Sequence, residues 1–463
     1  MKQSELIFAG VLLSIVAVGA ILVDVLIPQA NSRTAVNGTG PVLSSGWYCP
    51  SPTSTEEFQA FMSTANPGPS ALGLRRFAVG GSGQSAFAQS NLEPGHQAAA
   101  SLGDFNVNDA IGVVDAFGGQ SSTDLVVVAR GKGVGSSRCS EQPSDRWLFA
   151  TASTARGENH YLLVANPFRE EAVISVRFIA PDNDVVPARL KDLVIPARSQ
   201  ITVSLADYFV ESPAFGLDVT AAQGRVVVSR YSQLDRAGAR GASLDVGVSE
   251  PSASWTFAEG EPQGEESIVV VNPGAREALI GVVFMTEGDR TAPPALAEVP
   301  VPAGRQITVN TAEHIPAETS HGISLTSTNG EPVVAERRNT AGIDRNNGYE
   351  TSFGAPATAL RWAVPVGSPV GGNSFLSIVN PGNSRTSVKV TLLGGLGPVS
   401  PDGLASVPVE AGRKVTIDLT PLLNGEFYTA VVESSLRPIA IESTLRLASP
   451  YSDLSYNPGR ALS

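Results

Sequence analysis

The sequence predicts an all-β protein in which four tandem β-sandwich repeats, immunoglobulin-like or fibronectin-like, follow one N-terminal transmembrane helix. Three observations lead to this fold class. An uncharged apolar segment lies near the N-terminus, one set of landmarks recurs four times along the chain, and short alternating apolar and polar runs lie between the landmarks. The chain has 463 residues, of which 42% are hydrophobic, so it can form several buried cores.

The N-terminal segment is the first element. Residues 6–23 (LIFAGVLLSIVAVGAILV) contain no charged side chain. As a helix they span about 27 Å, which is close to the hydrocarbon thickness of a bilayer. The sequence therefore predicts a signal anchor over residues 1–27, with residues 6–27 in the membrane and residues 28–463 outside the cytoplasm. A cleaved signal peptide is the alternative, because 18–20 (VGA) has the small residues of a cleavage site.

A polar, flexible spacer over residues 28–46 is predicted to separate the anchor from the repeats. The four tryptophans of the chain then mark the repeats, at Trp47, Trp147, Trp255 and Trp362. An Asn-Pro pair follows each tryptophan at a similar distance, beginning at Asn66, Asn166, Asn272 and Asn380. These landmarks predict repeat 1 (47–146), repeat 2 (147–254), repeat 3 (255–361) and repeat 4 (362–463). Repeat 1 is the least regular of them.

The local pattern inside the repeats is that of strands. ISVRF (174–178) and VKVTL (388–392) alternate apolar and polar residues, which is typical of strands with one face on a core. Short strands in units near 100 residues favour a sandwich. The alternative is one closed assembly of blades, like a propeller, although each repeat is long for a single blade. EEFQAFMS (56–63) is the best candidate for a short amphipathic helix.

The landmarks have structural roles in this interpretation. Proline lacks a donor for strand pairing and restricts the residue before it, so each Asn-Pro pair is predicted to end a strand and begin a turn. Each tryptophan is predicted to pack in a sandwich core or against the next repeat. A ligand-binding role for these residues is the alternative. Weaker binding candidates, which could stack on a tryptophan or pair with a carboxylate such as Glu336, are Arg130, Arg230 and Arg337.

The chain has two cysteines, Cys49 and Cys139. An even number of cysteines outside the cytoplasm favours a disulfide. It would close a loop of about 90 residues and contribute about 4–5 kcal/mol of stability on the chain-entropy model. Two buried, unpaired thiols are the alternative.

The sequence contains no complete motif for catalysis, metal binding or phosphate binding. The net charge of −12 argues against nucleic acid as a partner, because binding to phosphates needs a concentrated positive surface. The four histidines lack the spacing of metal ligands, and no nucleophile or phosphate-loop motif is complete. We therefore expect no catalytic residue, no cofactor and no metal site. DRNNGYE (344–350) leaves calcium at a joint between repeats open.

The landmark pattern, in which Trp, Asn-Pro, Pro-Ala-Gly-Arg and a closing valine-rich strand follow a single anchor, resembles uncharacterised, membrane-anchored or secreted repeat proteins of actinobacterial envelopes. That resemblance implies no activity for any residue. We expect a non-enzymatic structural, adhesion or scaffold protein of the cell envelope. The first alternative is an accessory binding module for an envelope glycan or a partner envelope enzyme, and the remote alternative is a hydrolase with a site between repeats. The sequence does not determine whether the repeats form a rod or a compact particle, nor the oligomeric state.

Overall fold

Strands form where the sequence alternates apolar and polar residues. In β11 (Ala172–Ile179) every second side chain from Ala172 to Phe178 is buried, whereas those between them are partly exposed. Such a strand covers a core with one face only. The computed structural model describes residues 44–52, 58–80, 83–105, 110–260, 264–316, 319–341, 348–368, 370–423 and 425–462.

The first two repeats supply seventeen of the described strands. Those of repeat 1 are β1 (Ser44–Pro50), β2 (Phe58–Ala65), β3 (Leu72–Gly80), β4 (Gly83–Leu92), β5 (Gln97–Ser101), β6 (Ile111–Phe117), β7 (Ser122–Ala129) and β8 (Gly133–Arg138). Those of repeat 2 are β9 (Arg146–Ala152), β10 (Glu158–Asn166), β11, β12 (Asp184–Val185), β13 (Leu193–Ile195), β14 (Ser199–Ser204), β15 (Phe215–Gln223), β16 (Val227–Arg236) and β17 (Ala239–Val246).

The last two repeats follow the same order. Those of repeat 3 are β18 (Ser254–Phe257), β19 (Glu265–Asn272), β20 (Ala278–Met285), β21 (Arg290–Thr291), β22 (Val299–Val301), β23 (Arg305–Asn310), β24 (Gly322–Ser327), β25 (Val334–Ala341) and β26 (Gly348–Phe353). Those of repeat 4 are β27 (Arg361–Val366), β28 (Asn373–Asn380), β29 (Thr386–Gly394), β30 (Gly397–Val399), β31 (Val407–Val409), β32 (Arg413–Asp418), β33 (Tyr428–Ser434), β34 (Ala440–Leu447), β35 (Asp453–Asn457) and β36 (Arg460–Ala461).

Helical structure in the described part of the chain is confined to single turns. These are η1 (Leu102–Phe105), η2 (Ala188–Leu190), η3 (Leu205–Asp207), η4 (Pro294–Leu296), η5 (Thr311–Glu313) and α2 (Thr420–Leu423). None of them is long and apolar enough to cross a membrane. The predicted anchor over 1–27 and most of the spacer lie outside the described residues.

The described strands form eight antiparallel sheets, two in each repeat. One sheet of each repeat, here called the inner sheet, has the order β5-β2-β7-β8, β14-β10-β16-β17, β23-β19-β25-β26 or β32-β28-β34-β35. The other, the outer sheet, is built around β1-β6-β3-β4, β12-β11-β15-β9, β18-β24-β20-β21 or β30-β29-β33-β27-β36. Apolar side chains of both sheets share one core, as Leu162 of β10 and Val176 of β11 do in repeat 2. The all-β, sandwich-like prediction is confirmed.

The strand order differs from that of an immunoglobulin domain. In repeat 2 the second strand, β10, pairs with β14 and β16. The third strand, β11, pairs with β15, which also pairs with the first strand, β9. In an immunoglobulin sandwich the second strand instead pairs with the first and the fifth. Alternation along a strand identifies its buried face but not its neighbours, so the sequence pattern could not give this order.

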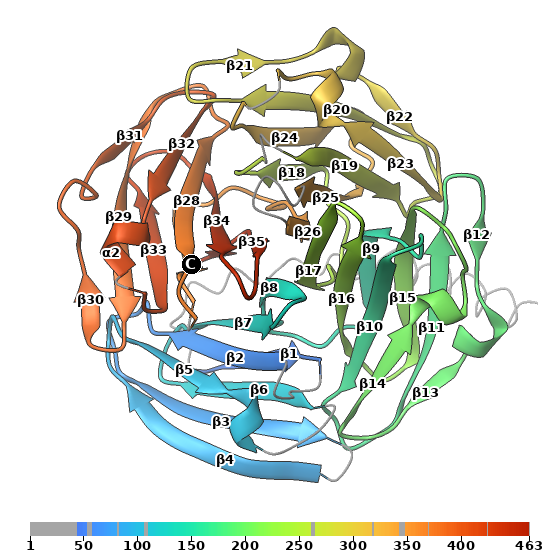
Figure 1. Cartoon of the computed structure of the whole chain (residues 1–463), viewed down its shortest axis with the longest axis horizontal. Coiled ribbons are helices and arrows are strands. Elements are labelled where there is room, and N and C mark those ends of the chain that lie inside the picture. The colour runs from blue at the N-terminus through green and yellow to red at the C-terminus, as the bar shows by residue number, and fades with distance from the viewer. Residues whose placement is uncertain are drawn as a thin grey trace, which may run out of the picture. The chain divides into compact units, whose positions relative to one another are not determined.

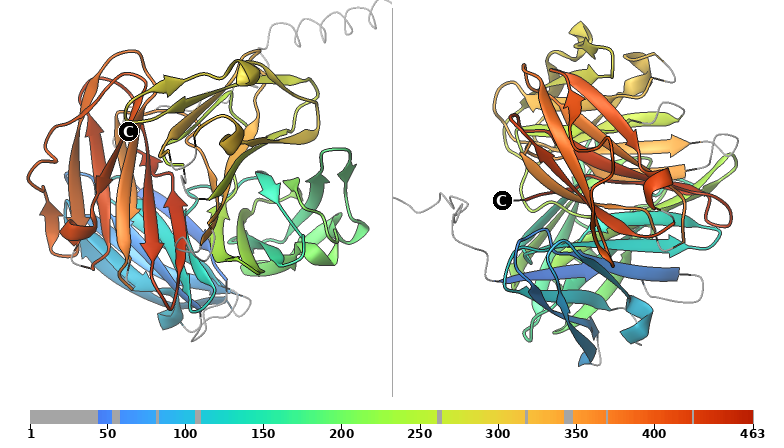
Figure 2. Two further views of the ribbon diagram at one scale, coloured as in Figure 1. Left: turned by 45° about the horizontal axis from the view of Figure 1, so that its top comes forward. Right: turned by 90° about the vertical axis from the view of Figure 1, so that its left-hand side faces the viewer.

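The four inner sheets meet at their last strands. β8 contacts β17, β17 contacts β26, β26 contacts β35, and β35 contacts β8. Repeat 4 therefore packs against repeat 1, and the repeats close into a ring within the compact unit Val42–Ser463 (Figure 1). Two further views show the same strands from other directions (Figure 2). This arrangement decides between the rod and the compact particle that the sequence left open.

Each landmark tryptophan lies in a core. The four indoles are at most 3% exposed, and each indole N–H donates a hydrogen bond inside its own repeat. In repeats 2, 3 and 4 the acceptors are equivalent carbonyl oxygens, those of Val226, Val333 and Ile439. In repeat 1 the acceptor is the hydroxyl of Ser121. In each repeat the tryptophan hydrogen bond thus joins the first strand of the outer sheet to the residue that precedes the third strand of the inner sheet.

The buried asparagine of each Asn-Pro pair organises one turn, whose tip is exposed, in each repeat. The Nδ2 of Asn272 donates to the carbonyls of Arg276 and Val301, at 2.7 and 2.9 Å, while its Oδ1 accepts the N–H of Gly274. The other three asparagines make the same set of bonds and are all fully buried: Asn66, Asn166 and Asn380. A side chain that satisfies three backbone groups explains why asparagine recurs there.

Cys49 and Cys139 form the predicted disulfide. The bond joins β1 of the outer sheet to the residue that follows β8 of the inner sheet, across a sequence separation of 90 residues. We expect Cys49→Ser combined with Cys139→Ser to lower the free energy of unfolding by about 2–5 kcal/mol, because the cross-link restricts the unfolded chain. Urea unfolding of the variant beside oxidised and reduced wild type measures this. A variant as stable as the oxidised wild type would contradict the prediction.

Candidate binding site at the centre of the ring

One carboxylate lies where the four inner sheets meet. Asp453, the first residue of β35, is 1% exposed. Its Oδ2 accepts the backbone N–H groups of Val134 and Ala242, at 2.9 and 2.7 Å. Its Oδ1 accepts those of Tyr349 and Leu454, at 3.0 and 2.9 Å. Asp453 thus joins one strand from each repeat. Burial raises the pKa of this carboxyl, and the four N–H donors oppose the shift because they stabilise the carboxylate.

The other three repeats have glycine at the position of Asp453. The four donors are equivalent residues, and those of repeats 1, 2 and 3 directly follow Gly133, Gly241 and Gly348. A Cβ added at Gly133 would lie 2.0 Å from Oδ2 of Asp453, and one at Gly241 would lie 2.4 Å from Oδ1. There is therefore space for a single carboxylate at the ring centre.

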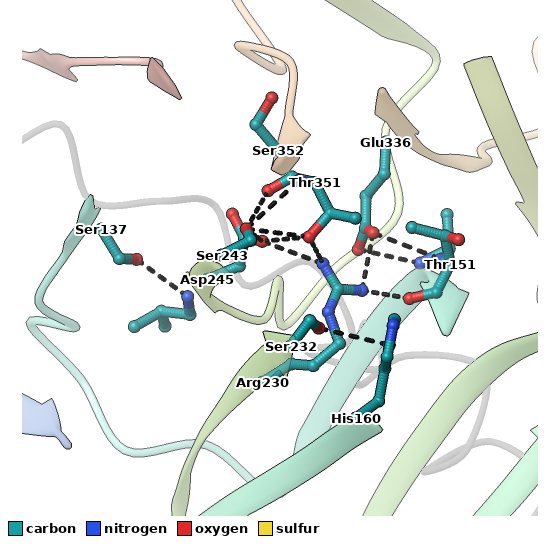
Figure 3. Close-up of polar contacts among 12 residues, drawn as sticks. Ser137, Thr151, His160, Arg230, Ser232, Ser243, Asp245, Glu336, Thr351 and Ser352 are labelled. Carbon is teal, nitrogen blue, oxygen red and sulfur yellow. Dashed lines mark hydrogen bonds and ion pairs between the residues drawn. The ribbon is translucent and has the colours of Figure 1, made fainter. Parts of the chain in front are cut away.

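A buried ion pair joins repeat 2 to repeat 3. Nη1 of Arg230 lies 2.7 Å from Oε2 of Glu336, and Nη2 lies 2.9 Å from Oδ2 of Asp245 (Figure 3). Glu336 also accepts the N–H groups of Ala150 and Thr151. Burial raises the pKa of Glu336 to about 7, against the opposing effect of the Arg230 charge. A pair this well hydrogen-bonded is expensive to break because either charge alone would be buried without a partner.

A second buried pair joins repeat 3 to repeat 4 in the same way. Nη1 of Arg337 lies 3.1 Å from Oε2 of Glu442, and its Nη2 donates to Oγ of Ser352. Glu442 accepts the N–H of Glu259, as Glu336 accepts that of Thr151. Burial raises the pKa of Glu442 to about 7 as well.

Arg130 does not occupy the equivalent position in repeat 1. It is exposed in the turn after β7. Arg230 lies opposite Leu162, and Arg337 lies opposite Ile268, in each case four residues before the Asn-Pro asparagine. The residue opposite Met62, four before Asn66, is Leu125, and in repeat 4 the position is Ser443. The sequence could have shown that Arg130 is not equivalent to Arg230 and Arg337. The signal is the number of residues between each position and the Asn-Pro pair, counted along the paired strands.

At the joint between repeats 4 and 1 the equivalent acidic residue is present, but no arginine occupies the position of Arg230 and Arg337. Asp124 of β7 occupies the position of Glu336 and Glu442, and it is 2% exposed. Its Oδ2 has no hydrogen-bond partner among the described residues. Burial raises the pKa of Asp124 to about 7, and the charges of Arg138 and Arg460 oppose that shift.

A pocket of about 640 Å³ opens at the ends of these central strands. All four repeats line it, which makes it the shared cavity of the ring. Its apolar lining includes the partly exposed Val246, Val248 and Pro251, with the buried rings of Trp47, Trp147, Trp255 and Phe353 behind them. Its polar lining includes Ser249 and the charged residues Arg138, Glu141, Asp245, Glu250 and Arg460. This volume is in the range of small-molecule sites, and a mixed aromatic and polar lining is typical of them.

Most of the inward charges in the pocket are already paired. Arg460 donates to Glu141 and to the carbonyl of Ser121, and its guanidinium lies 4.3 Å from the ring centroid of Trp47. Asp245 pairs with Arg230. The guanidinium of Arg138 differs, because it makes no hydrogen bond or ion pair to any residue that the structure describes. In repeats 2 and 3 the residues at its position are Val246 and Phe353.

The described residues contain no group of three or more His, Cys, Asp or Glu side chains that could hold a metal ion. Residues 344–347 of the suggested calcium segment, 344–350, lie outside the described residues.

Comparison with known proteins gives a family. The model of DUF5719, a family of unknown function, matches residues 107–367, which is more than half of the chain. The chain belongs to this family. The match runs from repeat 1 into repeat 4 and spans repeats 2 and 3 in full. No curated protein matches the chain.

Three solved structures match the chain with low TM-scores. The crystal structure of Thermotoga maritima 1070 is 20% identical, over 23% of this chain and 95% of that one, with a TM-score of 0.20. The Anabaena sensory rhodopsin transducer is 23% identical, over 19% and 98%, with a TM-score of 0.17. Streptomyces avermitilis α-L-rhamnosidase, in complex with L-rhamnose, is 8% identical, over 81% and 54%, with a TM-score of 0.13. At these scores the likenesses carry no argument about function.

Proposed function

We propose that this chain is a non-enzymatic binding protein of an actinobacterial-type cell envelope. An N-terminal anchor holds the ring outside the cytoplasm, and the pocket on the ring axis binds a saccharide unit of an envelope glycan. The observation that carries the proposal is the pocket itself, because residues of all four repeats form it and it exists only when the ring is closed.

The chemistry of the lining favours a sugar-like ligand. The partly exposed side chains of Val246, Val248 and Pro251 offer apolar surface to a sugar ring, and the serine hydroxyls and backbone groups around them can donate to and accept from its hydroxyls. The inward carboxylates Asp245 and Glu141 are each held by an arginine, which supports binding rather than acid–base catalysis. The disulfide and the uncharged segment 6–23 support a position outside the cytoplasm.

A substitution that fills the pocket tests the proposal. Ser249 is exposed and lines the pocket, so Ser249→Trp occupies the cavity without disturbing a core. Ser400 is exposed and outside the lining, so Ser400→Trp is the matched control. Calorimetry with neutral and carboxylated oligosaccharides should show binding by wild type and Ser400→Trp, and at least about tenfold weaker binding by Ser249→Trp. Absence of binding by wild type, or unchanged binding by Ser249→Trp, would overturn it.

A further inference from the structure

We propose that Arg138 recognises a carboxylate on the bound saccharide, so that the ligand is an acidic sugar. This inference rests on the proposed function of the axial pocket and adds the class of ligand. A guanidinium presents two parallel N–H groups that match the two oxygens of a carboxylate, which makes arginine the usual residue for this task.

Three observations on Arg138 support the assignment. The residue is the last of β8 and lines the pocket. Its guanidinium has no partner among the described residues, whereas the other inward guanidinium, that of Arg460, is held by Glu141 and Ser121. Repeats 2 and 3 have Val246 and Phe353 at the same position, which cannot perform this task. A feature that serves packing would recur in the repeats, and this one does not.

The charges around Arg138 are mixed, because the pocket lining carries Arg460 beside it and also Glu141, Asp245 and Glu250. Asp124 lies directly opposite it on β7, and Arg460 faces the same carboxyl from β36, with Asn457 of β35 beside it. Glu141 and Asp245 also act on Arg138, but each has its own arginine. Asp124 is therefore the buried acid that faces Arg138, and an incoming carboxylate would give the guanidinium of Arg138 the hydrogen-bonded partner that Arg230 has in Glu336.

Asp124 then acts as a positioning residue with a pH-dependent effect. Its pKa of about 7 means that the carboxyl gains charge as the pH rises through neutrality. A charged Asp124 competes with an anionic ligand for Arg138, so affinity for a carboxylated sugar should fall between pH 6 and pH 8. The carboxylate of the sugar stays ionised over this range. Glu336 and Glu442 also have a pKa of about 7, so the variant Asp124→Asn separates the effect of Asp124 from theirs.

The experiment compares two forms of one sugar on the full chain in detergent. The probes are a galacturonic acid tetrasaccharide and the same tetrasaccharide with its carboxylates methyl-esterified, measured by calorimetry at pH 6 and pH 8. Wild type should bind the free acid at least about tenfold more tightly than the ester at pH 6. Arg138→Met should bind both forms equally, Arg138→Lys should keep part of the preference, and Asp124→Asn should remove the pH dependence.

The outcomes separate the two proposals. Equal binding of acid and ester by wild type, unchanged by Arg138→Met, overturns the role of Arg138 and leaves the pocket function standing. Absence of binding of either form, with Ser249→Trp indistinguishable from wild type, overturns the pocket function and this inference together. Thermal unfolding of each variant confirms that a loss of binding is not a loss of fold.

Discussion

Asp453→Ala is expected to lower the free energy of unfolding by about 3–5 kcal/mol. The substitution leaves four buried N–H groups without an acceptor, one from each repeat, and each unpaired buried donor costs about 1–3 kcal/mol before water enters. Because these donors belong to all four inner sheets, the loss should also loosen the closed ring. Urea unfolding of the disulfide-bonded protein measures the first effect, and small-angle scattering the second.

Asp453→Asn is the matched control. Asparagine keeps the shape of the side chain but offers one oxygen, so two of the four N–H groups should lose their acceptor and the cost should be about half. A variant Asp453→Ala within about 1 kcal/mol of wild type, in a ring of unchanged dimensions, would show that the central carboxylate does not hold the repeats together.

Glu442→Ala is expected to cost about 3–5 kcal/mol. It leaves the fully buried guanidinium of Arg337 without its carboxylate, and a buried charge without a partner is the main expense of breaking such a pair. The exposed pair Arg385–Glu410 is the control within the same repeat, and Glu410→Ala should change stability by no more than about 1 kcal/mol. Chemical denaturation of both variants gives the comparison.

A double-mutant cycle separates the pair from the desolvation of either member. Arg337→Met combined with Glu442→Leu should be far less destabilising than the sum of the single substitutions, because it removes both charges together. Additive effects would contradict the interpretation that these charges act as one unit across the joint between repeats 3 and 4.

The pattern of neighbouring residues identified most strands, and where it failed, the reason lies in the same stretch of sequence. Period-two alternation identified strands such as 174–178 and 388–392 because each covers one core. The best candidate for a short helix, 56–63, is a strand from Phe58 onward, where β2 begins. Its residues Ala60 and Met62 alternate inward, but β2 is a central strand buried on both faces toward its end, and that blurs the period.

The candidate site was much less accessible from the sequence. The arginines Arg230 and Arg337 and the carboxylate Glu336 were recognised as possible partners, but nothing in the sequence said that a pair joins two different repeats. Arg138 and Asp124 carry no motif, and they become significant only because β8 lies at the ring axis. Two sequence signals were available: the distance of each residue from the Asn-Pro pair, and the replacement by Asp453 of a glycine found in the other three repeats.

The sequence by itself determined that this protein is an all-β chain of recurring units with one disulfide, because alternation, turn residues and cysteine count act within a unit. The order of strands in each sandwich, the closure of repeat 4 on repeat 1 and the pocket on the axis were decided by tertiary structure alone. The physical reason is that these features depend on which strand edges and buried charges meet across the joints, as Arg230 meets Glu336 and Asp453 meets three other strands. Contacts of this kind between repeats produce no periodic pattern in the sequence.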